Sequence, residues 1–275
     1  MCMGDVRRNP STAGIHKLTL ARFKTLMGVD ISYFQIPWYR EYRATKVGFR
    51  GSKKPGRWRN HLPKVLEVIL SRREKDPVVL FENVMKEIER FWHPAPNPKA
   101  PILRKMPMNG PWHHAIVPAV LIAALRNNGY PFTDEHISEA FHRGSMIPEG
   151  SCGFLGACGT AIGIGVAVSI VSGATPYHGE ERSLALKHTG EMMVELAKEG
   201  GPRCSKLSSY LTILHAVRVF KEEFGYELPV PSPEELQGRC PFWTRNPTCH
   251  LVKCRFNPLT RRMAREKGEQ KPAGG

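Results

Sequence analysis

The segment from Ser151 to Pro176, SCGFLGACGTAIGIGVAVSIVSGATP, joins a loop of glycines and cysteines to a long run without charged side chains. The run from Thr160 to Ser172 predicts a helix, and a helix that lacks a polar side is stable when its neighbours bury it all round. The run is about as long as the shortest membrane spans, but it is rich in small residues and lacks the aromatic or basic flanks that anchor a span. We therefore expect a buried helix around which a globular fold is organised.

Cys152 and Cys158 lie among the glycines that precede this helix. Glycines let a backbone fold tightly around a bound group, and the start of a helix favours a thiolate through its free N–H groups and its dipole. This pattern is typical of a soft-metal or cluster site. Free cysteines and glycines in a tightly packed core are the alternative.

The rest of the chain repeats apolar residues at helical spacing and shows no alternating strand pattern of useful length. Thr133 is the expected N-cap of one short helix, and Gly144 its expected stop. Glycines also end two longer amphipathic segments, 179–201 and 204–225, and further helices are expected within 62–73, 77–92 and 109–129. The sequence therefore predicts an all-α fold.

Composition divides the chain into five parts. Residues 1–63 form a basic N-terminal arm, and residues 64–100 form a helical lead-in with a proline-rich linker. Residues 101–230 form the helical domain in which we expect the cluster. Residues 231–258 form a cysteine-rich metal-binding tail, and residues 259–275 a disordered basic tail.

The formal charge of +15 is concentrated before residue 65, where WYREYRATKVGFRGSKKPGRWRNHLPK also carries aromatic side chains. Such an arm could bind RNA or an acidic protein; a solvated, partly disordered arm is the alternative. No zinc-finger or other named nucleic-acid motif accompanies the charge. No apolar signal region follows the N-terminus, so we expect a cytoplasmic protein that does not bind a membrane.

Seven cysteines, an odd number, favour metal or cluster ligation over disulfides in a reducing compartment. Cys240, Cys249 and Cys254 lie close together in a loop-rich run that is too short to bury a core of its own. We therefore expect these three residues to bind metal and to pin the tail to the helical body.

Cys204 stands at another helix start, after glycines and a proline. Together with Cys152 and Cys158 it could supply three thiolates to a four-iron cluster, 4Fe-4S, and one iron would then stay open as a Lewis acid. Zinc is the competing occupant, with His113 or His114 as its fourth ligand.

Other polar residues are candidates for substrate chemistry at such a site. His113 and His114 diverge by about 100° on a helix, so one of the two could act as a general base. Arg203 and Lys206 could hold the carboxylate or phosphate of a small anionic substrate, and His188 is a weaker candidate. The alternative is a capped or solvent-facing histidine pair with ordinary solvated charges.

Four segments occur in a familiar order: MNGPWHHAIVPAVLIAAL, EGSCGFLGACGTAIGIGVAVSIVSGATP, GGPRCSK and CPFWTRNPTCHLVKCRFNP. They resemble an uncharacterised domain-of-unknown-function family of methanogens and other anaerobes. The resemblance covers about residues 105–258, and because members are often fused to methyltransferase-like domains, it implies a methyltransferase partner. Many relatives carry a pair of CxxC motifs ahead of the shared region and a double cysteine where this chain has Cys204-Ser205.

A more distant resemblance is to the alpha chain of iron–sulfur L-serine dehydratases. It rests on Asn109-Gly110, on residues 117–121, on the segment from Cys152 to Cys158 and on residues 173–176. In that family a four-iron cluster held by three cysteines binds a hydroxy-amino acid and expels water. The resemblance implies lyase chemistry with Asn109 in the active site. The dehydratases place two cysteines in the downstream loop and one upstream, whereas this chain does the reverse.

Two functional classes follow from the sequence. The first is an iron–sulfur-dependent enzyme, lyase-like or sulfur-handling, that acts on a small anionic molecule. The second is a non-enzymatic module in which the cysteines hold a structural zinc or cluster and the basic arm docks on RNA or on a protein, for example during maturation of another enzyme. An open coordination position distinguishes the enzyme from the module.

Overall fold

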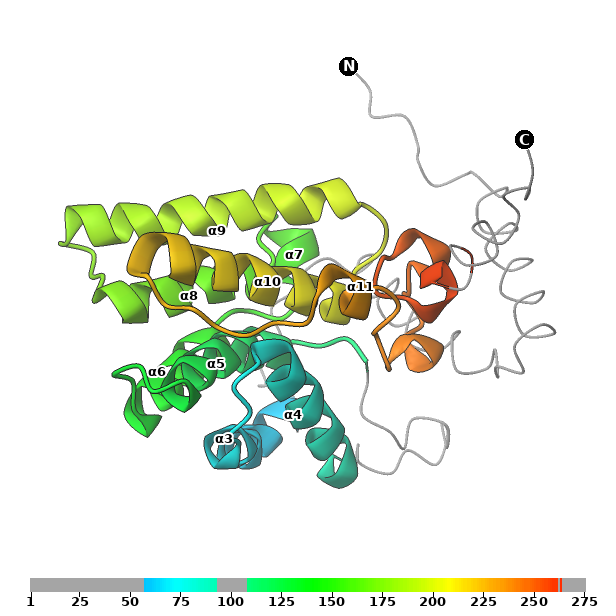
Figure 1. Ribbon diagram of the computed structural model, residues 1–275, viewed down its shortest axis with the longest axis horizontal. Helices are drawn as coiled ribbons and strands as arrows, with labels where there is room; N and C mark the ends of the chain where they lie inside the picture. The colour runs from blue at the N-terminus through cyan, green and yellow to red at the C-terminus, as the bar shows by residue number, and fades with distance from the viewer. Residues whose placement is uncertain (1–56, 93–107, 262, 264–275) are drawn as a thin grey trace, which may run out of the picture. The chain divides into compact units, whose positions relative to one another are not determined.

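A computed structural model describes residues 57–92, 108–261 and 263, all of which belong to the compact unit 49–275 (Figure 1). Every regular element in these ranges is a helix, which confirms the all-α prediction. Most of the basic N-terminal arm, most of the proline-rich linker and residues 264–275 lie outside the described ranges. The elements, in chain order, are η1 (Arg57–His61), α3 (Leu62–Ser71), α4 (Pro77–Phe91), α5 (Trp112–Asn127), α6 (Asp134–Ser145), α7 (Ser151–Phe154), α8 (Gly159–Ser172), α9 (Gly179–Glu199), α10 (Ser205–Phe224), α11 (Pro233–Leu236), η3 (Trp243–Arg245) and η4 (Leu251–Lys253).

Helix α5 runs through the core. From Trp112 to Leu125 all of its residues except His114 are buried, and the helix packs against α3, α4, α6, α8 and α10. Such a helix has no polar side to turn towards water, so it needs neighbours all round. The helices that precede and follow the proline-rich linker therefore share one core.

Helix α8 is the small-residue helix that the sequence predicted, and all of its residues are buried or half-buried. It packs against α5 and α9, and glycines allow both approaches. A Cβ at Gly163 would lie 3.0 Å from Pro118 Cδ of α5, and a Cβ at Gly165 would overlap Thr189 Oγ1 of α9. The glycines therefore serve close helix packing. No helix in the described ranges has the length and apolar character needed to cross a membrane.

Helix α6 begins where the sequence predicted but ends later. Thr133 is its N-cap, and its N–H donates to His136 Nδ1 at 3.1 Å as part of a capping box. Gly144, expected to stop the helix, lies inside its last turn. A Cβ at Gly144 would overlap the His114 carbonyl oxygen of α5, so this glycine allows the two helices to approach rather than ending α6.

Helices α9 and α10 lie side by side and run in opposite directions (Figure 1). The connection between them contains Gly200 and Gly201, which both have positive φ values of 59° and 69°. Glycine adopts this backbone region without the steric cost that other residues have. Gly225, in the left-handed conformation, caps the end of α10 as predicted.

The cysteine-rich tail packs on the helical body through ion pairs to α4. Arg239 Nε donates to Glu82 Oε1 at 2.8 Å, and the Tyr210 hydroxyl of α10 donates to the same oxygen at 2.8 Å. Further along the tail, Arg245 Nη2 contacts both carboxylate oxygens of Glu89, at 2.6 and 2.7 Å. The tail is therefore held against the body by protein contacts, while metal binding by its cysteines stays a prediction.

Candidate functional site

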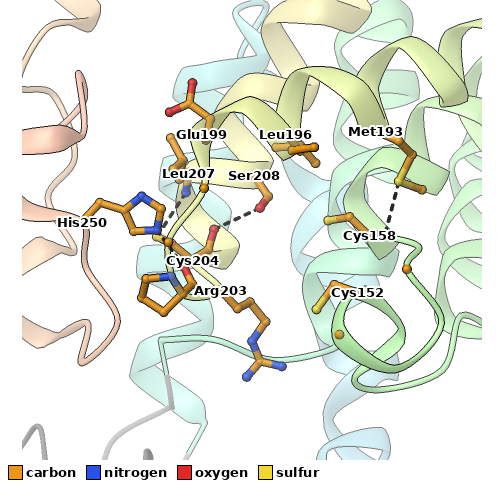
Figure 2. A pocket seen from close by; sticks show the side chains of 16 residues that line it. Cys152, Cys158, Met193, Leu196, Glu199, Arg203, Cys204, Leu207, Ser208 and His250 are labelled. Atoms are coloured by element: carbon orange, nitrogen blue, oxygen red, sulfur yellow. Dashed lines mark hydrogen bonds between the residues drawn. The ribbon is translucent and has the colours of Figure 1, made fainter. Parts of the chain in front are cut away.

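A pocket of about 420 Å³ lies where the α7–α8 loop, the end of α9, the α9–α10 connection and the tail meet. Cys152 and Cys158 line it from the α7–α8 region, Arg203 and Cys204 line it from the connection, and His250 lines it from the tail (Figure 2). The structure thus brings the three cysteines of the predicted cluster to one pocket. His250 was not among the predicted site residues.

The two cysteines before α8 differ in their surroundings. Cys158 is the N-cap of α8; its N–H donates to Met193 Sδ at 3.3 Å, and its Sγ lies 3.2 Å from Thr160 Oγ1. Burial raises the pKa of Cys152, the charge of Arg203 opposes that shift, and the charge of Cys158 adds to it. Both thiols and the guanidinium therefore act on one another across the same pocket.

Cys204 is the N-cap of α10 and turns towards the tail. Its Sγ accepts hydrogen bonds from the Leu207 N–H at 3.4 Å and from Asn246 Nδ2 of the tail at 3.0 Å. Burial raises the pKa of Cys204, whereas these hydrogen bonds and the charge of Lys206 lower it. Donors aimed at a sulfur stabilise its ionised form more than its neutral form.

All three tail cysteines interact electrostatically with Cys204. Burial is the main cause that raises the pKa of each thiol, to about 12 for Cys240 and about 11 for Cys254, and the charge of Cys204 raises all three further. Cys249 adds to the shifts of Cys240 and Cys254 in the same way. Since charge interactions weaken with distance, Cys204 lies near enough to each tail thiol to affect its ionisation. Cys204 thus belongs both to the pocket and to the tail cysteines.

Backbone N–H groups two positions downstream act on each tail sulfur. The Leu251 N–H donates to Cys249 Sγ at 3.5 Å, and the N–H groups of Phe242 and Phe256 lower the pKa of Cys240 and Cys254 respectively. Leu251 is the one non-glycine residue with a positive φ, 53°, in the part of the chain that the structure describes. Asn257 Nδ2 donates a second hydrogen bond to Cys249 Sγ at 3.2 Å. Because neutral thiols are weak acceptors, this set of donors suits thiolates or metal-bound sulfurs.

Asn109 ties the start of α10 to the tail. Its Oδ1 accepts the N–H of Ser205 at 2.7 Å, and its Nδ2 donates to Asn246 Oδ1 and Thr248 Oγ1, both at 2.8 Å. Asn109 therefore holds the amide that donates to Cys204 Sγ. It is not among the residues that line the pocket, and its predicted place in the active site stays a prediction.

His113 and Lys206 form a buried pair in the core and do not line the pocket. His113 Nδ1 lies 2.9 Å from the Gly110 carbonyl oxygen, which only accepts, so Nδ1 carries the proton and Nε2 accepts from Lys206 Nζ at 2.7 Å. Burial lowers the pKa of Lys206 to about 7, and burial with the Lys206 charge lowers the pKa of His113 well below its ordinary value. A substrate-binding role for Lys206 stays a prediction.

His114 also lies outside the pocket lining. Its Nδ1 is 3.4 Å from the Ile147 carbonyl oxygen, and its ring packs against the Gly159 backbone at the start of α8. Burial lowers the pKa of His114 to about 4, so its imidazole is neutral at pH 7. A general-base role for either histidine stays a prediction.

The family model of DUF5714, described as a family of unknown function, matches residues 99–257. The matched segment includes the pocket cysteines, the tail cysteines and the two asparagines that connect them. No curated protein and no solved structure matches the chain. Because the match extends over more than half of the sequence, the chain belongs to the DUF5714 family, whose function is unknown.

Proposed function

We propose that this protein binds an iron–sulfur cluster through Cys204, Cys240, Cys249 and Cys254, next to a thiol-lined pocket for a small anionic molecule. The main evidence for this proposal is the position of Cys204. Its sulfur accepts a hydrogen bond from Asn246 of the tail, and its ionised form would raise the pKa of all three tail thiols. Four sulfurs supplied with N–H donors are a suitable ligand set for such a cluster, because hydrogen bonds to the sulfurs stabilise and tune it.

The cysteine sulfurs of the described residues are not gathered at the spacing of a single zinc ion. No three cysteine sulfurs in the described ranges lie within 4.8 Å of one another. At a zinc–sulfur distance of about 2.3 Å, the sulfurs of a tetrahedral zinc site would be about 3.8 Å apart. The ligands of a four-iron cluster are spaced more widely, by roughly 7 Å, since each binds a different iron atom.

The pocket supports an activity on a small molecule beside the cluster. Its thiols, Cys152 and Cys158, face the same space as the Arg203 guanidinium, which can bind a carboxylate or phosphate. Sulfur handling by these thiols requires no open iron. Lyase chemistry of the kind that the distant resemblance to L-serine dehydratases implies would instead need Cys152, Cys158 and Cys204 as ligands, with one iron open.

Single Cys-to-Ser variants distinguish these ligand sets. The protein and its variants at all six positions are purified without oxygen, and iron, acid-labile sulfide and zinc are measured with visible and electron paramagnetic resonance spectra. We expect iron and sulfide in the unmodified protein, near-complete loss after substitution of Cys204, Cys240, Cys249 or Cys254, and retention after substitution of Cys152 or Cys158.

Four results would refute this ligand set or the cluster itself. Retention of the full cluster after loss of a tail cysteine would exclude that residue, and loss of the cluster with Cys152 or Cys158 would favour the open-iron enzyme. Zinc without sulfide would replace the cluster by a structural metal. Protein without any bound metal would leave only buried thiols. RNA, acidic-protein and methyltransferase partners stay predictions from the sequence.

A further inference from the structure

A second group of metal-ligating side chains lies between α9 and α10. His188 and Glu191 stand one turn apart on α9, and His215 faces them from α10. One ligand atom from each residue lies within 4.8 Å of the other two. We propose that His188, Glu191 and His215 bind a divalent transition-metal ion of the zinc class, independently of the cysteine site.

The distances suit a small four-coordinate ion. Glu191 Oε2 lies 3.0 Å from His188 Nδ1 and 3.7 Å from His215 Nε2. For a tetrahedral zinc ion with bonds of about 2.0–2.1 Å, ligand atoms are about 3.3–3.4 Å apart. The observed distances lie on either side of that value, so small side-chain adjustments would admit the ion.

An unpaired nitrogen of His215 is further evidence for a bound metal ion, separate from the distances between the ligand atoms. Its side chain is only 3% exposed, and its Nε2 has no hydrogen-bond partner among the described residues although it points towards Glu191. A buried polar nitrogen without a partner is destabilising, because it has given up its hydrogen bond to water and gained none in the protein. A metal ion at this position would satisfy the nitrogen that the protein alone leaves unpaired.

The second nitrogen of each imidazole contacts a carboxylate. His188 Nε2 lies 3.0 Å from Glu223 Oε1, and His215 Nδ1 lies 3.1 Å from Glu195 Oε2. A carboxylate that accepts the outer N–H of a histidine orients the other nitrogen towards a metal, and metal-binding histidines almost always donate this N–H to a carboxylate, a backbone carbonyl or water. Each of the two histidines therefore has its own carboxylate at the nitrogen that faces away from the proposed ion.

Arg218 bears on which nitrogen of His215 carries the proton. Arg218 Nη2 lies 2.8 Å from His215 Nδ1, so Arg218 and Glu195 compete for this nitrogen as donor and acceptor. A metal on Nε2 requires the proton on Nδ1 and thus selects the contact with Glu195. Metal binding would therefore fix one of two hydrogen-bond arrangements.

The ligand set indicates both the class of ion and a coordination position open to small molecules. Imidazole nitrogens favour zinc, iron, nickel or copper, whereas calcium and magnesium prefer oxygen ligands alone. Two histidines and one glutamate leave at least one position of the ion open. That position would face a pocket of about 820 Å³, in which water or a small anion could complete the coordination.

Cobalt(II) is the probe that separates this site from the cysteine site. Thiolate-bound cobalt has intense sulfur-to-metal bands in the near ultraviolet, whereas cobalt bound by nitrogen and oxygen shows only weak visible bands. We expect an anaerobic cobalt(II) titration of the purified full-length chain to produce the weak visible bands, before or after any thiolate bands appear. Zinc should displace this cobalt. Absence of the weak visible bands at saturation, or bands of thiolate character alone throughout the titration, would overturn the proposal.

Three substitutions test the assignment to residues. Glu191→Gln preserves size at a half-exposed position, so it should fold, and it should weaken cobalt binding by at least about 100-fold. Glu223→Gln, which changes the contacts of Glu223 with the outer nitrogen of His188 and with Lys187 Nζ, should weaken binding by about 10–100-fold. Glu222→Gln, a matched control that lines the same pocket outside the ligand set, should leave affinity unchanged. Equal affinities in all three variants would refute the site, whatever metal the cysteines bind.

Discussion

Replacement of Arg239 by methionine should destabilise the protein much more than loss of a surface ion pair would. The side chain of its partner, Glu82, is only 7% exposed and would retain a single donor, the Tyr210 hydroxyl. Removing one partner of a buried ion pair costs about 3–5 kcal/mol. Because the Arg239 side chain is 24% exposed, solvent screens part of the interaction. We therefore expect the free energy of unfolding to fall by about 2–4 kcal/mol.

The double variant Glu82→Met/Arg239→Met provides the decisive comparison. It removes the buried charge with its partner, so most of the loss should be recovered, except for about 1 kcal/mol from the Tyr210 hydroxyl that loses its acceptor. Urea unfolding followed by circular dichroism measures each variant at equal metal content. A loss below about 1 kcal/mol for Arg239→Met, or a double variant as unstable as the sum of the single ones, would refute the reasoning.

Two further predictions concern the start of α8. A Cβ at Gly159 would overlap the His114 ring, so Gly159→Ala should lower the free energy of unfolding by about 1–3 kcal/mol. The control Gly153→Ala places nothing within 4 Å of the added Cβ, so it should change the free energy of unfolding by less than about 0.5 kcal/mol in the same urea titration. Similar losses in the two variants would contradict the packing. The pKa of His114 is lowered from 6.5 to about 4, so the unfolded chain takes up a proton in that interval and the folded protein does not. Stability should fall by about 3 kcal/mol as the pH decreases through it, and His114→Gln should remove that part of the fall; identical pH dependence of both proteins would contradict the shift.

Local signals made most helices predictable from the sequence. Thr133 begins one helix and Gly225 ends another through contacts and backbone conformation within a few residues of the chain, and the structure confirms both. Gly144 shows the limit of such signals. It lies inside α6 because the α5 backbone approaches it, and nothing in its neighbouring sequence distinguishes a glycine that ends a helix from one that admits another helix.

The candidate site was predictable in its residue types but not in its grouping. Cysteines after glycines at helix starts identified Cys204 as a ligand candidate, but its proximity to the tail depends on how the tail folds back onto α10. Asn109 and Asn246 join these segments through hydrogen bonds between residues far apart in the chain. The spacing of His188 and Glu191 on α9 is a weak signal by itself, and only the packing of α10 adds His215.

Helix α10 begins after Cys204 and carries His215 further along. At a rise of 1.5 Å per residue, the two positions are about 16 Å apart along a stiff rod. An unpaired electron at the cysteine site and another on a metal ion at the histidine site would be close enough to sense each other magnetically. With both sites filled, the number of residues between Cys204 and His215 on this one helix would fix the distance between the two metal centres.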